Sequence, residues 1–143
     1  MSACGRDSVV LTGRVLIDGT ARGPLLCLAE PISFWGGVDP ATARLTDRRH
    51  PQHGVSIAGT VLALAATRGS SSSSAIMLEL LARGIAPAAL LLGEPDAILA
   101  LGVVVGREMG YKAIPVLAIR ASEQERLPEG ILCIAAGGTI SAA

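Results

Sequence analysis

Five consecutive serines, residues 70–74, directly follow Arg68 and Gly69 and offer the clearest opportunity for chemistry in this chain. An apolar run at residues 61–66 precedes them and a helical pattern at residues 75–83 follows. The serines are therefore expected between the end of a strand and the start of a helix. A helix start presents free backbone N–H groups and the positive end of the helix dipole. The segment is thus a candidate site for a carboxylate or a phosphate.

A flexible serine linker is the alternative interpretation of this run. Linkers normally continue in Gly, Ser or polar residues on both sides. Here both flanks are hydrophobic and patterned, so we favour a turn built onto the core.

The surrounding elements that must position the serines follow from the apolar pattern. Strands, or pieces of strands, are expected at residues 8–11, 14–17, 25–28, 55–64, 88–92, 114–119 and 131–135. Helices are expected at residues 75–83 and 95–109, stopped by Gly84 and Gly110. Turns are expected at residues 18–19 and 22–23, and a charged turn or short helix at residues 122–130. This order predicts a layered α/β domain with a mixed sheet.

Composition limits the possible partners. The 143 residues suit a single domain, residues 1–143, with residues 1–7 and 137–143 expected to be frayed. Half the residues are hydrophobic, and the formal net charge is zero. A chain with no net charge lacks the excess of positive charge that favours binding to nucleic acid or to an anionic membrane. No apolar run reaches transmembrane length, and the start of the chain lacks a signal peptide's apolar segment, so a cytoplasmic location is expected.

The cysteines and histidines predict no metal site in this chain. Cys4, Cys27 and Cys133 are widely spaced, and the last two lie in apolar runs where we expect buried side chains. His50 and His53 have the spacing of a ligand pair, but Pro51 lies between them and no third ligand follows at regular spacing. A solvated or interfacial loop is the favoured interpretation.

Two segments together resemble a known family. Residues 31–40 read Pro-Ile-Ser-Phe-Trp-Gly-Gly-Val-Asp-Pro, and residues 68–74 read Arg-Gly followed by the five serines. They resemble the two signature segments of the small subunit of aconitase X enzymes, which is similar to the swivelling fourth domain of aconitases. The resemblance extends over residues 11–115. It implies an aconitase-like swivel β/β/α fold and a large-subunit partner that carries an iron–sulfur cluster on its own cysteines.

The resemblance also implies a hydro-lyase reaction and assigns residues to it. Ser70 matches the serine that acts as the base in aconitases, and the arginine that binds substrate there falls on Ser72 here. Arg68 could supply part of the missing charge, and Gly69 and Ser71 complete the expected substrate contacts. A serine oxygen needs donors and positive potential to act as a base, and the N–H groups of residues 71–73 could provide them.

The aromatic segment has two open interpretations. Phe34, Trp35, Gly36, Gly37 and Asp39 could form a wall of the substrate pocket, with the glycine N–H groups facing the substrate. The same loop could instead seat the domain on its partner. The carboxylate of Asp39 could bind a serine or a substrate amine, or could cap the turn at the following proline.

The resulting expectation is a subunit of a dehydratase that is inactive without its large subunit. Family members dehydrate cis-3-hydroxy-L-proline or a phosphorylated mevalonate. The composition, rich in Ala, Arg and Gly, favours a bacterial source and hence the first substrate. The alternatives are a phosphomevalonate dehydratase small subunit and a non-catalytic module that binds an anion. For Ser70 alone, a simple helix-capping role is also open.

Overall fold

The computed structural model describes residues 9–143, in which three strands come first, helices and strands then alternate, and two strands come last. The strands are β1 (Val9–Thr12), β2 (Arg14–Ile17), β3 (Ala21–Cys27), β4 (Val61–Leu64), β5 (Ala89–Leu92), β6 (Val116–Ala118), β7 (Ile131–Ala135) and β8 (Thr139–Ala142). The helices are α1 (Phe34–Gly37), α2 (Ser73–Arg83), α3 (Ala97–Glu108) and α4 (Ala121–Gln124).

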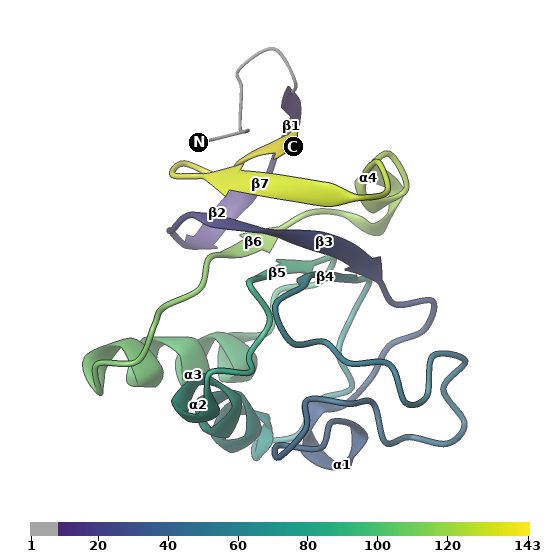
Figure 1. The fold of residues 1–143 in the computed structure, drawn as a ribbon, viewed down its shortest axis with the longest axis vertical. Coiled ribbons are helices and arrows are strands. Elements are labelled where there is room, and N and C mark those ends of the chain that lie inside the picture. Colours follow the sequence, from purple (N-terminus) through teal and green to yellow (C-terminus); the bar gives the residue numbers. More distant parts are fainter. Residues whose placement is uncertain (1–8) are drawn as a thin grey trace.

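All eight strands form one mixed sheet in the order β1-β8-β7-β3-β4-β5-β6-β2. The central strands β3, β4, β5 and β6 are parallel, and the remaining pairs are antiparallel. Only Gly13 separates β1 from β2, although these strands lie at opposite ends of the sheet order. The sheet must therefore curl back over itself, as Figure 1 shows. The predicted α/β fold with a mixed sheet is confirmed.

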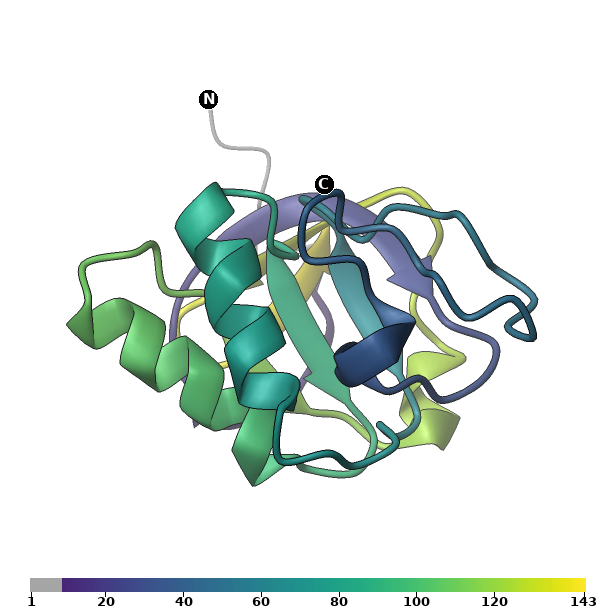
Figure 2. The same ribbon diagram turned by 90° about the horizontal axis from the view of Figure 1, so that it is seen from below.

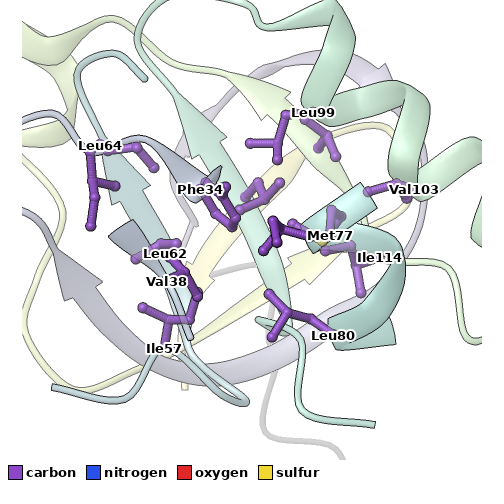
Figure 3. Close-up of a cluster of buried hydrophobic side chains, with 14 of the residues drawn as sticks. Phe34, Val38, Ile57, Leu62, Leu64, Met77, Leu80, Leu99, Val103 and Ile114 are labelled. Atoms are coloured by element: carbon purple, nitrogen blue, oxygen red, sulfur yellow. The ribbon is translucent and has the colours of Figure 1, made fainter. Parts of the chain in front are cut away.

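The curled sheet encloses one core and shares a second with the helices. In β4, Val61 and Ala63 belong to the cluster between the two parts of the sheet, whereas Leu62 and Leu64 belong to the helix-side cluster. Alternation of this kind with all four residues buried is typical of a strand covered on both faces. Met77 of α2 joins Leu62 and Leu64 on the helix side (Figure 3). The layers are thus β/β/α, with α2 and α3 side by side under the sheet (Figures 1 and 2).

The helix α2 ends as the sequence predicts. Gly84 adopts a left-handed conformation with φ of +72°, and its N–H group contacts the carbonyl oxygens of Leu80 and Leu81. The helix α3 begins later than expected, because Asp96 rather than Pro95 starts it: its carboxylate accepts from the backbone N–H groups of Ile98 and Leu99.

Three local expectations are wrong. Residues 139–142, expected in a frayed tail, form β8 between β1 and β7, because Gly137 and Gly138 take positive φ values and close a hairpin. Residues 22–23, expected in a turn, lie within β3. Of the strand expected at residues 55–64, only the last four residues form β4. The expectation of fraying at residues 1–7 concerns residues outside the described part of the chain.

The cysteines differ from each other. Cys133 lies in β7 and is buried, as predicted. The prediction that Cys27 is buried is wrong, because Cys27 ends β3 with its residue exposed. Cys4 lies outside the described residues. Between residues 9 and 143, no helix has the length and apolar character needed to cross a membrane.

Candidate functional site

The two segments that carry the family resemblance meet in space. Ile32 forms a parallel β-bridge with Thr67. The N–H group of Arg68 donates to the carbonyl oxygen of Ile32 over 3.0 Å. The loop that enters α1 therefore runs directly beside the segment that leads from β4 to the serines, although Ile32 and Thr67 are 35 positions apart in the sequence.

Ser70 lies in the turn before α2 rather than at its cap. Its Oγ accepts a hydrogen bond from the N–H group of Ser72 over 3.2 Å, and its carbonyl oxygen accepts from the N–H group of Ser73 over 3.1 Å. The helix begins at Ser73, so Ser72 is the N-cap residue, and its own hydroxyl makes no capping bond. The bond from the Ser72 N–H group to the Ser70 hydroxyl is nevertheless of the kind that caps a first helical turn, so the capping and catalytic roles of Ser70 both stay open. Its side chain is half-buried and lies outside both hydrophobic clusters.

One of the three expected donors reaches the Ser70 oxygen. The Ser72 N–H group does so, while the Ser73 N–H group bonds the Ser70 carbonyl oxygen instead. Ser71 is exposed and Ser72 is half-buried, so both remain within reach of a bound molecule. A donor at Oγ favours negative charge on that oxygen, and the start of α2 adds to the effect.

Gly69 is open to its surroundings. A Cβ at this position would meet no atom within 4 Å, and its φ lies outside the left-handed region. The backbone of Gly69 therefore does not need the left-handed angles that favour glycine. Nothing in the described chain requires a glycine there, which leaves room for a molecule or chain that approaches from outside.

Sequence reasoning missed the contact that anchors the segment. The hydroxyl of Thr67 donates to Oδ2 of Asp96 over 2.5 Å, while Oδ1 of the same carboxylate caps α3. An aspartate before a helical pattern is a capping signal that was available in the sequence. Its second role, which ties Thr67 to the start of α3, depends on tertiary structure.

The aromatic pair divides between core and surface. Phe34 is 1% exposed and points into the helix-side core, near Met77 and Leu99 in Figure 3, so its side chain is not available for the pocket wall that was one of the two open interpretations. Trp35 is 57% exposed. The structure explains why glycines occupy the next two positions. Gly36 has a φ of +80°, which other residues rarely adopt, and a Cβ on Gly37 would lie 2.7 Å from the Ile32 side chain.

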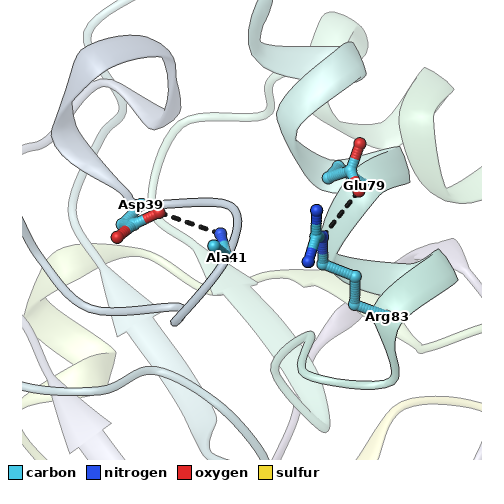
Figure 4. Close-up of polar contacts among 4 residues, drawn as sticks. All are labelled: Asp39, Ala41, Glu79 and Arg83. Carbon is cyan, nitrogen blue, oxygen red and sulfur yellow. Dashed lines mark hydrogen bonds and ion pairs between the residues drawn. The ribbon is translucent and has the colours of Figure 1, made fainter.

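Asp39 serves the turn that follows it. Its Oδ1 accepts from the N–H group of Ala41 over 2.9 Å (Figure 4), and its carbonyl oxygen accepts from the N–H groups of Thr42 and Ala43. Of the two expectations for Asp39, the structure shows the turn-capping contact. No contact with a serine of residues 70–74 is present among the hydrogen bonds of Asp39.

A polar cleft of about 440 Å³ opens beside Arg68. Glu30 and Pro31 line it from the segment after β3, and Asp47, Arg49 and His50 line it from the loop before β4. We call it the charged cleft. Sequence reasoning placed Arg68 at the site but missed the other charged residues, because they lie in loops without periodicity.

His50 forms the buried wall of the charged cleft and is 5% exposed. Its Nδ1 accepts from the N–H group of Gln52 over 3.0 Å. Its Nε2 therefore carries the proton and donates to the carbonyl oxygen of Glu30 over 2.9 Å. Both ring nitrogens are used by the protein, and no group of three or more potential ligands gathers anywhere in residues 9–143.

Comparison with known proteins identifies the family. The family described as the aconitase X swivel domain matches residues 10–141. The chain belongs to the aconitase X swivel-domain family. The crystal structure of Thermococcus kodakaraensis aconitase X in its holo-form superposes with a TM-score of 0.79 at 31% identity, covering 92% of this chain and 95% of that chain.

Curated relatives of this aconitase X swivel domain have two names. Cis-3-hydroxy-L-proline dehydratase of Pseudomonas aeruginosa is 44% identical over 77% of this chain, and that of Hypocrea jecorina is 40% identical over 90%. The chain spans only 19% and 22% of these two proteins. The phosphomevalonate dehydratase small subunit of Thermococcus gammatolerans is 35% identical over 82% of this chain and 89% of its own length.

Proposed function

We propose that this chain supplies the base of an aconitase X-type hydro-lyase, which is completed by a large subunit. The observation that carries the proposal is the position of Ser70. Ser70 is a half-buried residue outside the aliphatic clusters, and its Oγ accepts a backbone N–H group. Arg68, two residues before it in the chain, lines the charged cleft. The relatives named as dehydratases and as small subunits support both the reaction class and the need for a partner.

In the proposed reaction, Ser70 Oγ removes the proton on the carbon next to a carboxylate. The electron pair of that C–H bond forms a double bond to the neighbouring carbon as its C–O bond breaks, and the departing hydroxide takes a proton from solvent and leaves as water. The N–H group of Ser72 and the dipole of α2 stabilise negative charge on Oγ. Arg68 and the open position of Gly69 would receive the substrate's carboxylate.

An iron–sulfur cluster on the large subunit would supply the Lewis acid for the departing hydroxyl. The described residues 9–143 offer no ligand set for such a cluster, so nothing in the role proposed for this chain passes through it. The chain without its partner is expected to be inactive. A cytoplasmic location is part of the proposal and rests on the sequence alone.

The substrate proposed is cis-3-hydroxy-L-proline. The relatives named for that reaction are 44% and 40% identical, and small subunits named for phosphomevalonate are 41% and 35% identical, so sequence identity does not separate the two substrates. The choice rests on the composition rich in Ala, Arg and Gly. A phosphorylated mevalonate is the second candidate, because the relatives with that name match over most of their own length.

The decisive experiment is Ser70→Ala in the complex with the large subunit, with Ser74→Ala as the matched control. Loss of a general base should lower kcat by a factor of about 10² or more. Exchange of the substrate's α-proton with deuterated solvent should stop as well. Ser74→Ala, at the second residue of α2, should leave both rates within about threefold. A Ser70→Ala complex that assembles and retains near-normal turnover would exclude the proposal and favour a non-catalytic anion-binding module.

A further inference from the structure

Ser33 carries a buried hydroxyl that the fold leaves without a partner. Among the described residues 9–143, its Oγ is the one buried side-chain oxygen or nitrogen that makes no hydrogen bond. The residue as a whole is half-buried, so it is the oxygen that is turned away from solvent. Buried hydroxyls in folded proteins are nearly always bonded, because an unmade bond leaves the cost of desolvation uncompensated. The contacts within the chain therefore do not explain this hydroxyl.

The usual structural role of a serine before a helix is missing at Ser33. It is the N-cap residue of α1, yet its side chain makes no capping bond. A cap needs N–H groups two or three residues later that point back at the hydroxyl, as they do in a regular first turn. In α1, Trp35 and Gly36 have non-helical backbone angles. Ser33 thus has an oxygen that neither caps a helix nor bonds in the core.

The backbone places Ser33 beside Arg68. Ile32 and Thr67 are paired in parallel, and the N–H group of Arg68 donates to the carbonyl oxygen of Ile32. Ser33 has extended backbone angles, with φ of −92° and ψ of 132°, so it continues this pairing by one residue. Paired extended segments lie about 5 Å apart. Ser33 and Arg68 are therefore direct neighbours across the two segments that carry the family resemblance.

The side chains of Ser33 and Arg68 share one face of this pairing. Along an extended segment successive side chains alternate, and paired residues of parallel segments point to the same side. Ile32 lies in the helix-side cluster and the Thr67 hydroxyl bonds the start of α3, so this pair faces the helices. Phe34 returns to the same side and is 1% exposed. Ser33 and Arg68 thus face the other way.

Arg68 is available for an anion close to Ser70. It is exposed, and neither of the two ion pairs in the described part of the chain includes it. Ser70 is two residues further on, which is at most about 7 Å of backbone. In the proposed reaction the substrate carboxylate is attached to the carbon that Ser70 deprotonates. The groups that bind this carboxylate must therefore lie close to Ser70, as Arg68 and its neighbour Ser33 do.

We propose that Ser33 is a substrate-binding residue, whose hydroxyl turns outward in the assembled enzyme and donates to the substrate carboxylate beside the Arg68 guanidinium group. This inference rests on the proposed function and adds a binding residue to it. The change needed is a rotation about χ1, which moves a serine oxygen between staggered positions without moving the backbone. A charge-assisted hydrogen bond then replaces the bond that is unmade in the free chain. Both candidate substrates carry a carboxylate, so the assignment does not depend on the choice between them.

The melting temperature of the free chain gives the first test. Ser33→Ala removes one oxygen that has no partner, so it should raise the melting temperature by about 2–5 °C. Ser56→Ala is the matched control, because the Ser56 hydroxyl accepts from the N–H group of Ala58 over 3.2 Å. The control should lower the melting temperature. An unchanged or lower value for Ser33→Ala would show that the hydroxyl is already bonded in the free chain, for example by a buried water, and would overturn the proposal.

Steady-state kinetics of the complex with the large subunit give the second test. The substrate is cis-3-hydroxy-L-proline, or the phosphorylated mevalonate if the complex turns over that compound instead. Loss of a hydrogen bond to a carboxylate should raise KM about tenfold or more in Ser33→Ala, with kcat within about threefold. Ser56→Ala should change neither. An unchanged KM for Ser33→Ala, even with a raised melting temperature, would exclude a contact with the substrate.

A third measurement separates this inference from the proposed role of Ser70. Calorimetric titration of the Ser70→Ala complex with the same substrate should show binding that the added Ser33→Ala weakens about tenfold. That result supports the binding role of Ser33 even if Ser70→Ala retains turnover and the proposed base is excluded. If Ser33→Ala weakens subunit association while KM stays unchanged at saturating large subunit, the hydroxyl bonds the partner and the proposal is overturned.

Discussion

The hydroxyl of Thr67 donates to Oδ2 of Asp96 over 2.5 Å, and Oδ1 of that carboxylate accepts from the first N–H groups of α3. One aspartate therefore joins the start of α3 to the residue three positions before Ser70. On its other side, Thr67 is bridged to Ile32. Thr67 is thus held from two directions, and the turn that contains Ser70 begins from a fixed point.

Replacing Thr67 tests whether this anchor positions Ser70. Thr67→Val removes the hydroxyl at nearly constant volume, and Thr67→Ser retains it. We expect Thr67→Val to lower kcat of the complex with the large subunit about tenfold with little change in KM, and to lower the free energy of unfolding by about 1 kcal/mol. Thr67→Ser should restore both. If Thr67→Val loses stability alone, the contact is structural and does not position the base.

The packing of α3 against the start of α2 should be sensitive at Gly102. A Cβ there would lie 2.6 Å from the backbone oxygen of Ser74, whereas a Cβ at Gly106 would lie 2.8 Å from the flexible Leu81 side chain. Gly102→Ala must therefore displace the first turn of α2, at a cost of about 1–3 kcal/mol in unfolding free energy. Gly106→Ala is the control and should cost less. Urea denaturation measures both, and equal costs would contradict the argument.

The neighbouring aromatic residues should respond in opposite ways. Phe34 is fully packed in the helix-side core, so Phe34→Ala should cost about 3–5 kcal/mol of stability. Trp35 is exposed, so Trp35→Ala should leave the melting temperature of the chain unchanged. If Trp35 seats the domain on the large subunit, its removal should weaken the complex by more than tenfold. Unchanged affinity with a raised KM would instead place Trp35 at the substrate.

Cys27 should react slowly at neutral pH although its residue is exposed. Partial burial of the thiol raises its pKa, because desolvation disfavours the thiolate. The folded-state pKa then lies above the unfolded one, so the neutral thiol favours the folded state, and this advantage is lost as pH rises above the unfolded pKa. Peptide mapping after iodoacetamide treatment at pH 7.5 should show slower labelling of Cys27 in the native chain than in urea. Equal rates would contradict the shift.

Local patterns in the sequence were sufficient for the elements and the family. Apolar runs predicted strands at residues 55–64 and 88–92, which contain β4 and β5, and Gly84 marked the end of α2. Apolar runs and left-handed glycines are properties of a few neighbouring residues, so the sequence shows them directly. The two segments around Trp35 and Ser70 carried the family resemblance for the same reason. Local pattern failed at residues 139–142, whose small side chains carry no strong strand signal and pair only because β1 and β7 flank them.

The tertiary structure alone decided which side chains share a surface. Phe34 and Trp35 are adjacent in the chain, yet one lies in the core and the other in solvent, because α1 packs on α2 through one side only. Glu30, Asp47 and Arg49 meet Arg68 because the parallel order of β3 and β4 returns their loops to one place. A charge on an aperiodic loop has no sequence signal for its partner. Its neighbours are set by strand order and by single contacts such as the one from His50 to Glu30.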